Sequence, residues 1–333
     1  MKKERVFITG GTGFVGANLT EYLIKRGFSD IKIYDNLSAG KKEHIDKIAK
    51  KLGCKSERKS KNKTVYKNSN RPLNLVLVVG DILDAKILNK EMNGYDVVIH
   101  LAAHTRVLES LKEPEENFKV NAIGTFNVLE ASRKNKIKKF IFASSNAVVG
   151  EQISPISEKM VPKPLSPYGA TKLFGEGLCS AYYYSYGLKT VSLRFANCYG
   201  PYSEHKTSVI AKFIRRAKKG LPLEIYGDGT QTRDFIHVSD VCQAIYRCVT
   251  NNSSLGGEVF QIATGKETRI IDLAKMVNRL FAQENNLKFS SSRVGEIRKN
   301  FSDIRKAKTL LGFKPEIKLE EGLKSLITSR LNE

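Results

Sequence analysis

The sequence predicts an α/β fold, a doubly wound parallel sheet with a smaller C-terminal α/β lobe. Two observations predict it. Apolar runs of strand length alternate with segments long enough for crossover helices, and a glycine-rich turn follows the first of these runs. Continuous apolar strands that alternate with helices are typical of a parallel sheet that is covered on both faces.

The first predicted unit is a strand, a glycine turn, a helix and a second strand that ends in an acid. It runs from Val6-Phe7-Ile8 through Thr9-Gly10-Gly11-Thr12-Gly13-Phe14-Val15-Gly16 to Ile31-Lys32-Ile33-Tyr34-Asp35. A β-carbon at Gly10 would block the tight turn, Gly13 lets the backbone approach a pyrophosphate, and Gly16 lets the helix pack on the strand. The free amides and the positive end of the helix can hold phosphate.

Asp35 indicates which dinucleotide fits this turn. It follows Gly16 by 19 residues, where its carboxylate can accept both hydroxyls of an adenosine ribose. A 2′-phosphate would be repelled there, so the unit predicts NAD rather than NADP as the cofactor.

Four further strands follow in the first two hundred residues. They are predicted at residues 75–79, 97–101, 140–143 and 190–195, and the separating segments 115–134 and 167–186 are long enough for crossover helices. Ligands of such sheets sit beyond the carboxyl ends of the strands. We therefore expect the chemistry just after six positions: Thr9, Asp35, Val79, Leu101, Ser144 and Phe195.

From about Gly200 the alternation of strands and helices becomes less regular, because glycine and proline residues interrupt it. Helices are predicted at residues 208–219, 239–250, 271–284 and 304–311. The predicted division is therefore a domain of residues 1–200 that carries the cofactor turn, and a lobe of residues 201–333 that binds the substrate. Some strands and helices are expected to cross between the two.

Composition excludes several classes of protein. The 333 residues suggest about two domains, and 41% apolar residues fit a globular chain without a run of the ~20 apolar residues that span a bilayer. The apolar stretch near the N-terminus is too short for a signal peptide. Five cysteines without CxxC spacing predict reduced thiols and a cytoplasmic protein, and the five histidines lack ligand spacing, so we expect no metal.

The charge is strongly positive, since 56 basic and 34 acidic residues give a net charge of +22. Either a nucleic-acid surface or a lysine-rich solvated surface around an anionic-ligand site would explain it. Residues 41–71 carry 12 Lys or Arg and 3 Asp or Glu, and residues 53–63 are predicted to form an exposed loop. Tyr66 is the one aromatic residue in this stretch, so stacking platforms are missing, which argues against nucleic acid as a partner.

A serine, a tyrosine and a lysine form the predicted catalytic group. The strand at residues 140–143 delivers Ser145 at its carboxyl end, and Pro167 suits the first turn of the following helix. Tyr168 and Lys172 are four residues apart and share one helix face. Lowering the tyrosine pKa from near 10 to about 7 takes ~4 kcal/mol of preferential phenolate stabilisation, which an ammonium and a positive nicotinamide ring can supply. The group is suited to proton abstraction coupled to hydride transfer.

With these motifs in place, the chain resembles the extended short-chain dehydrogenase/reductases, and specifically the nucleotide-sugar epimerase/dehydratase family with its UDP-hexose 4-epimerases. The similarity covers nearly the whole length and implies a Rossmann domain. Its marks are the glycine turn, Asp35-Asn36-Leu37-Ser38, Gly80-Asp81-Ile82, Leu101-Ala102-Ala103, Asn121-Ala122-Ile123-Gly124-Thr125, Ser144-Ser145, Tyr168 with Lys172, Leu193-Arg194-Phe195-Ala196-Asn197-Cys198-Tyr199-Gly200-Pro201, Arg233-Asp234-Phe235-Ile236-His237-Val238 and Gly295-Glu296-Ile297-Arg298.

The resemblance implies an NAD site in the first domain. Asp81 and Ile82 would contact the adenine, and Asn121 would brace the site. The full set implied for the cofactor is Gly10, Gly13, Phe14, Val15, Gly16, Asp35, Asn36, Asp81, Ile82, Leu101, Ala102, Ala103, Asn121, Tyr168 and Lys172.

The resemblance also implies a nucleotide-sugar site in the second lobe. Asn197 would hold the phosphates, and Arg233 and Arg293 would pair with the pyrophosphate, because a guanidinium fork suits phosphate oxygens. Tyr226 would pack on uracil. Glu296 stands where a common family member has an aspartate that contacts the nucleotide ribose.

The residues after Ser145 discriminate among the reactions of this family. Sugar 4,6-dehydratases carry Asp-Glu there, and UDP-glucuronate decarboxylases carry a glutamate, whereas this chain has Asn146 and Ala147. Neither can exchange the proton that elimination needs, so that reaction loses a catalyst worth about 10²- to 10⁴-fold. The implied function is a UDP-sugar 4-epimerase that works through a 4-keto intermediate, with Ser145 and Asn146 contacting the sugar.

The sugar is left open. Asn300 matches a gate position where a residue smaller than tyrosine admits N-acetyl sugars, and Arg106 could meet a hexuronate carboxylate. UDP-GlcNAc/GalNAc and UDP-glucose/galactose are the main candidates, and a UDP-glucuronate 4-epimerase, dehydratase or reductase is the enzymatic alternative. The non-enzymatic alternative is an NAD-carrying, RNA-associated binding protein. The family usually dimerises through helices that match residues 115–134 and 167–186, which implies a homodimer.

Overall fold

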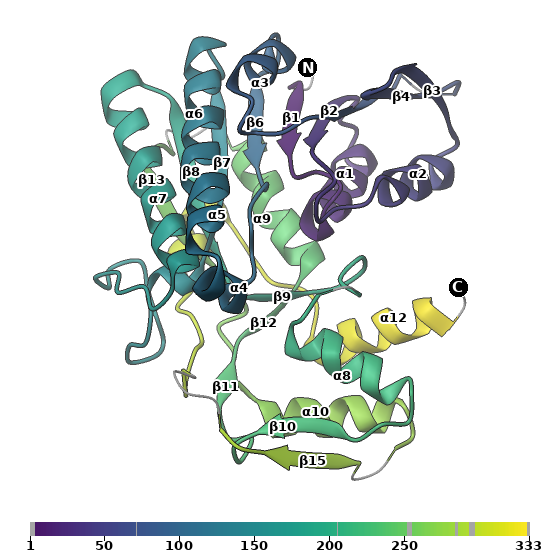
Figure 1. Cartoon of the computed structure of the whole chain (residues 1–333), viewed down its shortest axis with the longest axis vertical. Coiled ribbons are helices and arrows are strands. Elements are labelled where there is room, and N and C mark those ends of the chain that lie inside the picture. Colours follow the sequence, from purple (N-terminus) through teal and green to yellow (C-terminus); the bar gives the residue numbers. More distant parts are fainter. Residues whose placement is uncertain are drawn as a thin grey trace.

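A nine-stranded sheet forms the centre of the upper part of the molecule in the computed structural model (Figure 1). The structure describes residues 4–70, 72–204, 206–251, 255–283, 286–292 and 297–331. The strand order is β13-β8-β7-β6-β1-β2-β5-β4-β3. Its parallel strands are β1 (Val6–Thr9), β2 (Asp30–Asp35), β5 (Asn74–Val79), β6 (Val97–His100), β7 (Lys139–Ser145), β8 (Lys189–Phe195) and β13 (Glu258–Ile262).

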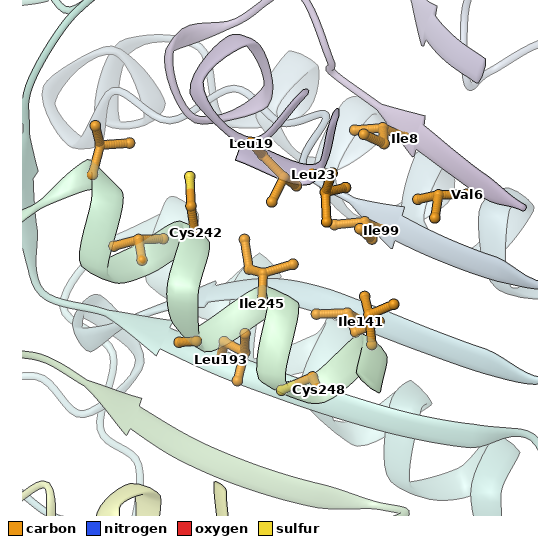
Figure 2. Packing of buried hydrophobic residues seen from close by; sticks show 14 of the residues in the cluster. Val6, Ile8, Leu19, Leu23, Ile99, Ile141, Leu193, Cys242, Ile245 and Cys248 are labelled. Atoms are coloured by element: carbon orange, nitrogen blue, oxygen red, sulfur yellow. The ribbon is translucent and has the colours of Figure 1, made fainter. Parts of the chain in front are cut away.

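Helices cover both faces of this sheet, which confirms the doubly wound α/β fold. One face carries α1 (Phe14–Lys25), α2 (Lys42–Lys51), α9 (Val238–Thr250) and α11 (Arg305–Leu311). The other carries α3 (Ala85–Met92), α6 (Gly124–Lys134) and α7 (Pro167–Tyr186), with α4 (Val107–Lys112), α5 (Pro114–Phe118) and the π-helical turn η1 (Lys119–Ile123) packed beside α7. In Figure 2, apolar side chains of α1 and α9 pack against those of the sheet strands that these two helices cover.

The ends of α7 follow from its sequence. The Ser166 hydroxyl accepts a hydrogen bond from the backbone nitrogen of Gly169, and Pro167 occupies the first turn. At the other end Gly187 adopts a left-handed conformation with φ 69° and stops the helix. The predicted segment 167–186 is therefore one continuous helix.

The lower lobe is smaller and has its own apolar core. It contains α8 (Val209–Ala217), α10 (Ile270–Leu280) and α12 (Leu319–Leu331), together with two short strand pairs. The first pair is β10 (Leu223–Tyr226) with β15 (Leu287–Ser290), and the second is β11 (Thr232–Arg233) with β14 (Thr268–Arg269). Strands β9 (Asn197–Tyr199) and β12 (Phe235–His237) pair between the lobes. Segments after residue 200 also return to the upper sheet: β13 is the edge strand beside β8, and α9 and α11 pack on one face.

The basic segment differs from its prediction as a loop. Residues 53–63 contribute most of a hairpin of β3 (Cys54–Ser60) and β4 (Lys63–Asn68), and β4 pairs antiparallel with β5. Val65 and Tyr66 anchor the hairpin in the core, and the Tyr66 hydroxyl donates to Asp46. The loop prediction was wrong because β3 is an edge strand with exposed side chains, so it carries no apolar signal.

Candidate active site

The glycine turn, the end of β2 and the segments after β5 and β6 together line one pocket. Every residue predicted for the cofactor in these segments borders it: Gly10, Gly13, Phe14, Val15, Gly16, Asp35, Asn36, Asp81, Ile82, Leu101, Ala102 and Ala103. These segments lie at the carboxyl ends of the strands, as expected for a parallel sheet.

Two glycines of the turn tolerate no side chain. A β-carbon on Gly16 would lie 2.4 Å from the Gly10 carbonyl oxygen, and one on Gly10, whose φ is 69°, would lie 2.6 Å from the Ala102 nitrogen. Both values are far inside contact distance. Glycine at these two positions therefore lets the turn pack directly against the start of α1 and against the segment after β6.

The Asp35 carboxylate is buried in the wall of this pocket, beside the glycine turn. It accepts hydrogen bonds from the backbone nitrogens of Thr12 (3.0 Å) and Leu37 (2.9 Å). These donors fix its orientation toward the turn. Beside it, the Asn36 amide donates to the Asp81 carboxylate over 2.9 Å, which joins the two predicted adenosine-binding segments.

Asn121 lies beside this pocket rather than in its wall. Its side chain accepts from the His104 nitrogen (2.8 Å) and donates to the His104 carbonyl oxygen (3.0 Å) and to the Thr171 hydroxyl (3.3 Å). It thereby ties the segment after β6 to α7.

A second pocket adjoins the first and contains Ser145, Tyr168 and Lys172. Val15, Leu101 and Ala103 border both pockets. The Lys172 ammonium donates to the Ala143 carbonyl oxygen over 2.9 Å and lies 5.9 Å from the centre of the Tyr168 ring. The predicted catalytic group is therefore assembled at the carboxyl end of β7.

Burial controls the protonation of this group. It raises the pKa of Tyr168, an effect that a hydrogen bond with the Ser145 side chain opposes. It lowers the pKa of Lys172 to about 7. In this state the phenol therefore keeps its proton at neutral pH, whereas our sequence analysis expected a phenolate that the cofactor's charge would help to form.

His100 lies behind the catalytic group, in β6. Its ring nitrogens are hydrogen-bonded to the hydroxyls of Thr9 (2.7 Å) and Thr125 (3.0 Å). Burial, with the Lys172 charge, lowers its pKa to about 3, so the imidazole is neutral at physiological pH. It is a hydrogen-bonded core residue.

A third pocket leads into the lower lobe and shares Asn197 and Val209 with the second. It brings together three of the predicted nucleotide residues, Asn197, Tyr226 and Arg233. Arg233 donates to the carbonyl oxygens of Thr232 and Ile297, each over 2.7 Å. The three pockets thus form a continuous path from the glycine turn to Tyr226.

Two of the predicted substrate residues do not border these pockets. Asn146 is buried and donates to the Ser302 hydroxyl over 2.9 Å, and Asn300 is buried as well; neither borders the three pockets. Arg293 and Glu296 lie outside the described residues.

The structure adds residues that the sequence analysis missed. Lys206 borders both the first and the second pocket, and its ammonium lies 4.8 Å from the Phe14 ring centre. Lys212 and Arg216 border the third pocket. The segment that contains Lys206 carries no motif of its own. The one sequence signal for a role of Lys206 was its position shortly after the Asn197-to-Pro201 motif.

Comparison with known proteins decides the family. The model of the NAD dependent epimerase/dehydratase family matches residues 6–263. The chain belongs to this family.

Solved structures of similar proteins share the whole fold. A UDP-N-acetylglucosamine 4-epimerase from Methanobrevibacter ruminantium, in complex with UDP-N-acetylmuramic acid, is 32% identical with a TM-score of 0.86, covering 100% of this chain and 99% of that chain. A UDP-glucose 4-epimerase from Thermotoga maritima, with UDP-glucose, is 32% identical with a TM-score of 0.85, covering 99% and 100%. A UDP-glucuronate 4-epimerase from Thermodesulfobacterium geofontis is 31% identical over 324 residues, 96% of this chain and 94% of its own.

The residues present fit NAD, the cofactor of this family. The glycine turn and the first residues of α1 line the first pocket, where the free backbone amides of a helix N-terminus suit a phosphate. Asp35 places a carboxylate where a ribose 2′-hydroxyl suits it and a 2′-phosphate does not. NAD would be held by the residues that line the first pocket.

Proposed function

We propose that the protein is a UDP-sugar 4-epimerase that oxidises the sugar at C4 and reduces the 4-keto intermediate on its other face. NAD, when bound, supplies a hydride acceptor and a positive charge. Tyr168 takes the C4 hydroxyl proton and later returns it, and the Ser145 hydroxyl holds the reacting oxygen. Lys172 provides a nearby positive charge that favours the phenolate form of Tyr168.

One observation separates epimerisation from elimination. No Asp or Glu is among the described residues that border the pocket around Ser145, Tyr168 and Lys172. Ala147 follows the serine by two positions, and its backbone nitrogen donates to the Ser145 hydroxyl. A sugar bound there would meet no carboxyl group to remove a C5 proton, so a reversible oxidation at C4 is the reaction that these side chains support.

A hexuronate is the second candidate sugar, and Lys206 favours it. Its ammonium borders the sugar pocket, and the Arg106 charge contributes to lowering the pKa of Lys206, so two cations are close together there. A uronate carboxylate would compensate both charges. The relatives named above include enzymes for N-acetylhexosamine, hexose and hexuronate substrates.

We further propose that the protein is a homodimer in the cytoplasm. Phe118, Ile123 and Phe126 on the α5–η1–α6 segment and Phe174 on α7 are 43 to 51% exposed, which is consistent with a helix-bundle contact between two copies. None of the five cysteines, all within the described residues, forms a disulfide, which fits a reducing compartment. No helix in the described residues is long and apolar enough to cross a membrane.

The experiment is a substrate panel. The purified protein is incubated separately with UDP-glucose, UDP-N-acetylglucosamine and UDP-glucuronate, and the C4 epimers are separated by chromatography. Interconversion of at least one pair without added NADH supports the proposal. Loss of water from the sugar, or net NADH formation, would instead indicate a dehydratase or an oxidoreductase.

A further inference from the structure

A buried row of polar side chains lies between α7 and the sheet, next to the catalytic group. Ser144 of β7, Arg194 of β8 and Gln261 of β13 are in register on adjacent strands and so point to one face. Glu176 of α7 meets this row. Its carboxylate accepts from the Ser144 hydroxyl (2.5 Å) and, in a bidentate pair, from Arg194 Nε (2.8 Å) and Nη2 (2.7 Å).

This ion pair is almost fully removed from solvent. The side chains of Arg194 and Glu176 are 4% and 5% exposed. Burying two charges is costly, and a bidentate geometry with a further donor offsets that cost only in part. The pair therefore adds little to the free energy of folding, and we look for a function in the active site instead.

The pair is connected to the catalytic lysine by position. Glu176 follows Lys172 by one helical turn, so the two side chains share a face of α7. Lys172 donates to the carbonyl oxygen of Ala143, and Glu176 accepts from the side chain of Ser144, the next residue. Ser145 comes directly after these two. Both charged residues of α7 therefore bind the strand segment that carries the catalytic serine.

The charged groups around Lys172 indicate how the ion pair can affect the pKa of this lysine. The elements packed on α7 bring few titratable groups to it. The neutral His100 of β6 is affected by the Lys172 charge, Arg194 of β8 pairs with Glu176, and Glu130 of α6 accepts from the Tyr182 hydroxyl. The side chains of α4, α5 and η1 that bind α7 at Tyr168 and Thr171 are the uncharged Ser110, Asn117 and Asn121. The thiol of Cys179, whose pKa burial raises to about 12, is neutral at pH 7, and Lys206 borders the same pocket. Cys179 and then Glu176 oppose the effect of burial on the pKa of Lys172, and of the two Glu176 is the carboxyl group that pairs with Arg194.

We propose that Glu176 and Arg194 form a positioning pair whose balanced charge sets the protonation of Lys172, and through it the pH at which Tyr168 accepts a proton. The catalytic part of this inference rests on the proposed function. Removing the carboxylate leaves an extra positive charge, which favours deprotonation of every nearby group. Removing the guanidinium leaves an extra negative charge and has the opposite effect.

The test measures the titration of Lys172 directly, by NMR of the protein with ¹³C-labelled lysine, with Lys172→Met to assign the signal. Glu176→Gln is expected to lower the apparent pKa of Lys172 by about one unit, and Arg194→Met to raise it by about one unit. The double variant Glu176→Leu/Arg194→Met restores the balance and is expected to titrate as the unaltered protein does. Arg133→Met, which breaks the surface ion pair with Glu130, is the matched control and should leave Lys172 unchanged.

Breaking a buried pair can prevent folding, so a second variant adds charge without removing a partner. Arg194 Nη1 and the polar side-chain atoms of Gln261 have no hydrogen-bond partner among the described residues, and Gln261→Glu places a carboxylate beside that nitrogen. It should raise the pKa of Lys172. An unchanged pKa in Gln261→Glu, or shifts in the same direction in Glu176→Gln and Arg194→Met, would overturn the proposal.

Where the protein is active, the pH profile of kcat supplies the second measurement. Both limbs of the profile should move to lower pH in Glu176→Gln and to higher pH in Arg194→Met, because the limbs report coupled groups that feel the same charge. A merely structural pair would lower kcat in both variants without opposite displacements. If no UDP-sugar is epimerised, the proposed function fails, while the NMR titration still decides the role of the pair.

Discussion

Lys172 donates its hydrogen bond to Ala143, not to Tyr168: the ammonium lies 2.9 Å from the Ala143 carbonyl oxygen and 5.9 Å from the Tyr168 ring centre. In the proposed mechanism the lysine therefore acts on the tyrosine through its charge. A positive charge at this distance would favour the phenolate without competing for the proton that Tyr168 is proposed to exchange. The backbone of β7 fixes the charge in place.

Replacing Tyr168 by phenylalanine should remove the proton acceptor and little else. Tyr168 is buried, and its hydroxyl interacts with the Ser145 side chain. We expect kcat to fall by about 10²- to 10⁴-fold while NAD stays bound. Turnover is measured by epimer separation, and bound NAD by its release on denaturation. Turnover equal to that of the unaltered protein would remove Tyr168 from the mechanism.

Adding one methyl group to the glycine turn should abolish cofactor binding. In Gly16→Ala the new β-carbon would lie 2.4 Å from the Gly10 carbonyl oxygen, so the turn or α1 must shift. We expect a protein that no longer retains NAD. The matched control is Gly177→Ala, where nothing lies within 4 Å of the new β-carbon; this helix-interior change should raise stability by about 0.5–1 kcal/mol and leave NAD bound. Both effects are read from NAD content and thermal unfolding.

Lys206 should bind an anion that spans the first two pockets. Burial lowers the pKa of its ammonium, which makes an unfilled site unfavourable for the charge. We expect Lys206→Met to weaken NAD or UDP-sugar binding about tenfold, which corresponds to about 1.4 kcal/mol, and Lys206→Arg to bind nearly normally. Isothermal titration with each ligand separately identifies which one is held. Full affinity for both in Lys206→Met would contradict this role.

His100 should make folding sensitive to acid. Its pKa is lowered to about 3 in the folded protein, against about 6.5 in an unfolded chain, so between these values the unfolded state binds more protons. Stability contributed by the neutral imidazole is therefore present above pH 6.5 and is lost as the pH falls, by about 2 kcal/mol between pH 6.5 and pH 5. Denaturant unfolding at both pH values should show a smaller loss in His100→Gln. The partly exposed His104, changed to glutamine, serves as the control and should behave as the unaltered protein does.

The proposed homodimer can be tested by adding charge to the helix face that would form its contact. Phe126→Asp and Phe174→Asp place a carboxylate on the exposed helix face of α6 and α7, and we expect each to shift the protein to monomers in analytical ultracentrifugation. Leu310→Asp changes an apolar residue of similar exposure on α11 and should leave the assembly intact. Dimers that persist in both phenylalanine variants would place the contact elsewhere.

Local patterns predicted the elements that carry the chemistry. The glycine turn, the acid at Asp35 and the Tyr168–Lys172 spacing are each set within one strand, turn or helix, so chain order alone reveals them. The same holds for the predicted helices in the second half, although α10 ends at Leu280, before the predicted end at residue 284. The hairpin of β3 and β4 was not predicted, because it is formed by pairing with β5 and not by a segment with apolar periodicity.

The sequence by itself determined the sheet with its cofactor turn and the helix face that holds Tyr168 and Lys172, since these depend on neighbours a few residues apart. Tertiary structure decided the rest. Lys206 borders the same pocket as the glycine turn, which lies far from it in the sequence. Asn121 ties the segment after β6 to α7, and Glu176 of α7 pairs with Arg194 of β8. The Glu176 position one turn after Lys172 was visible in the sequence, but its partner was not. Partners distant in the chain are chosen by packing and charge compensation in three dimensions, and a linear pattern does not record that choice.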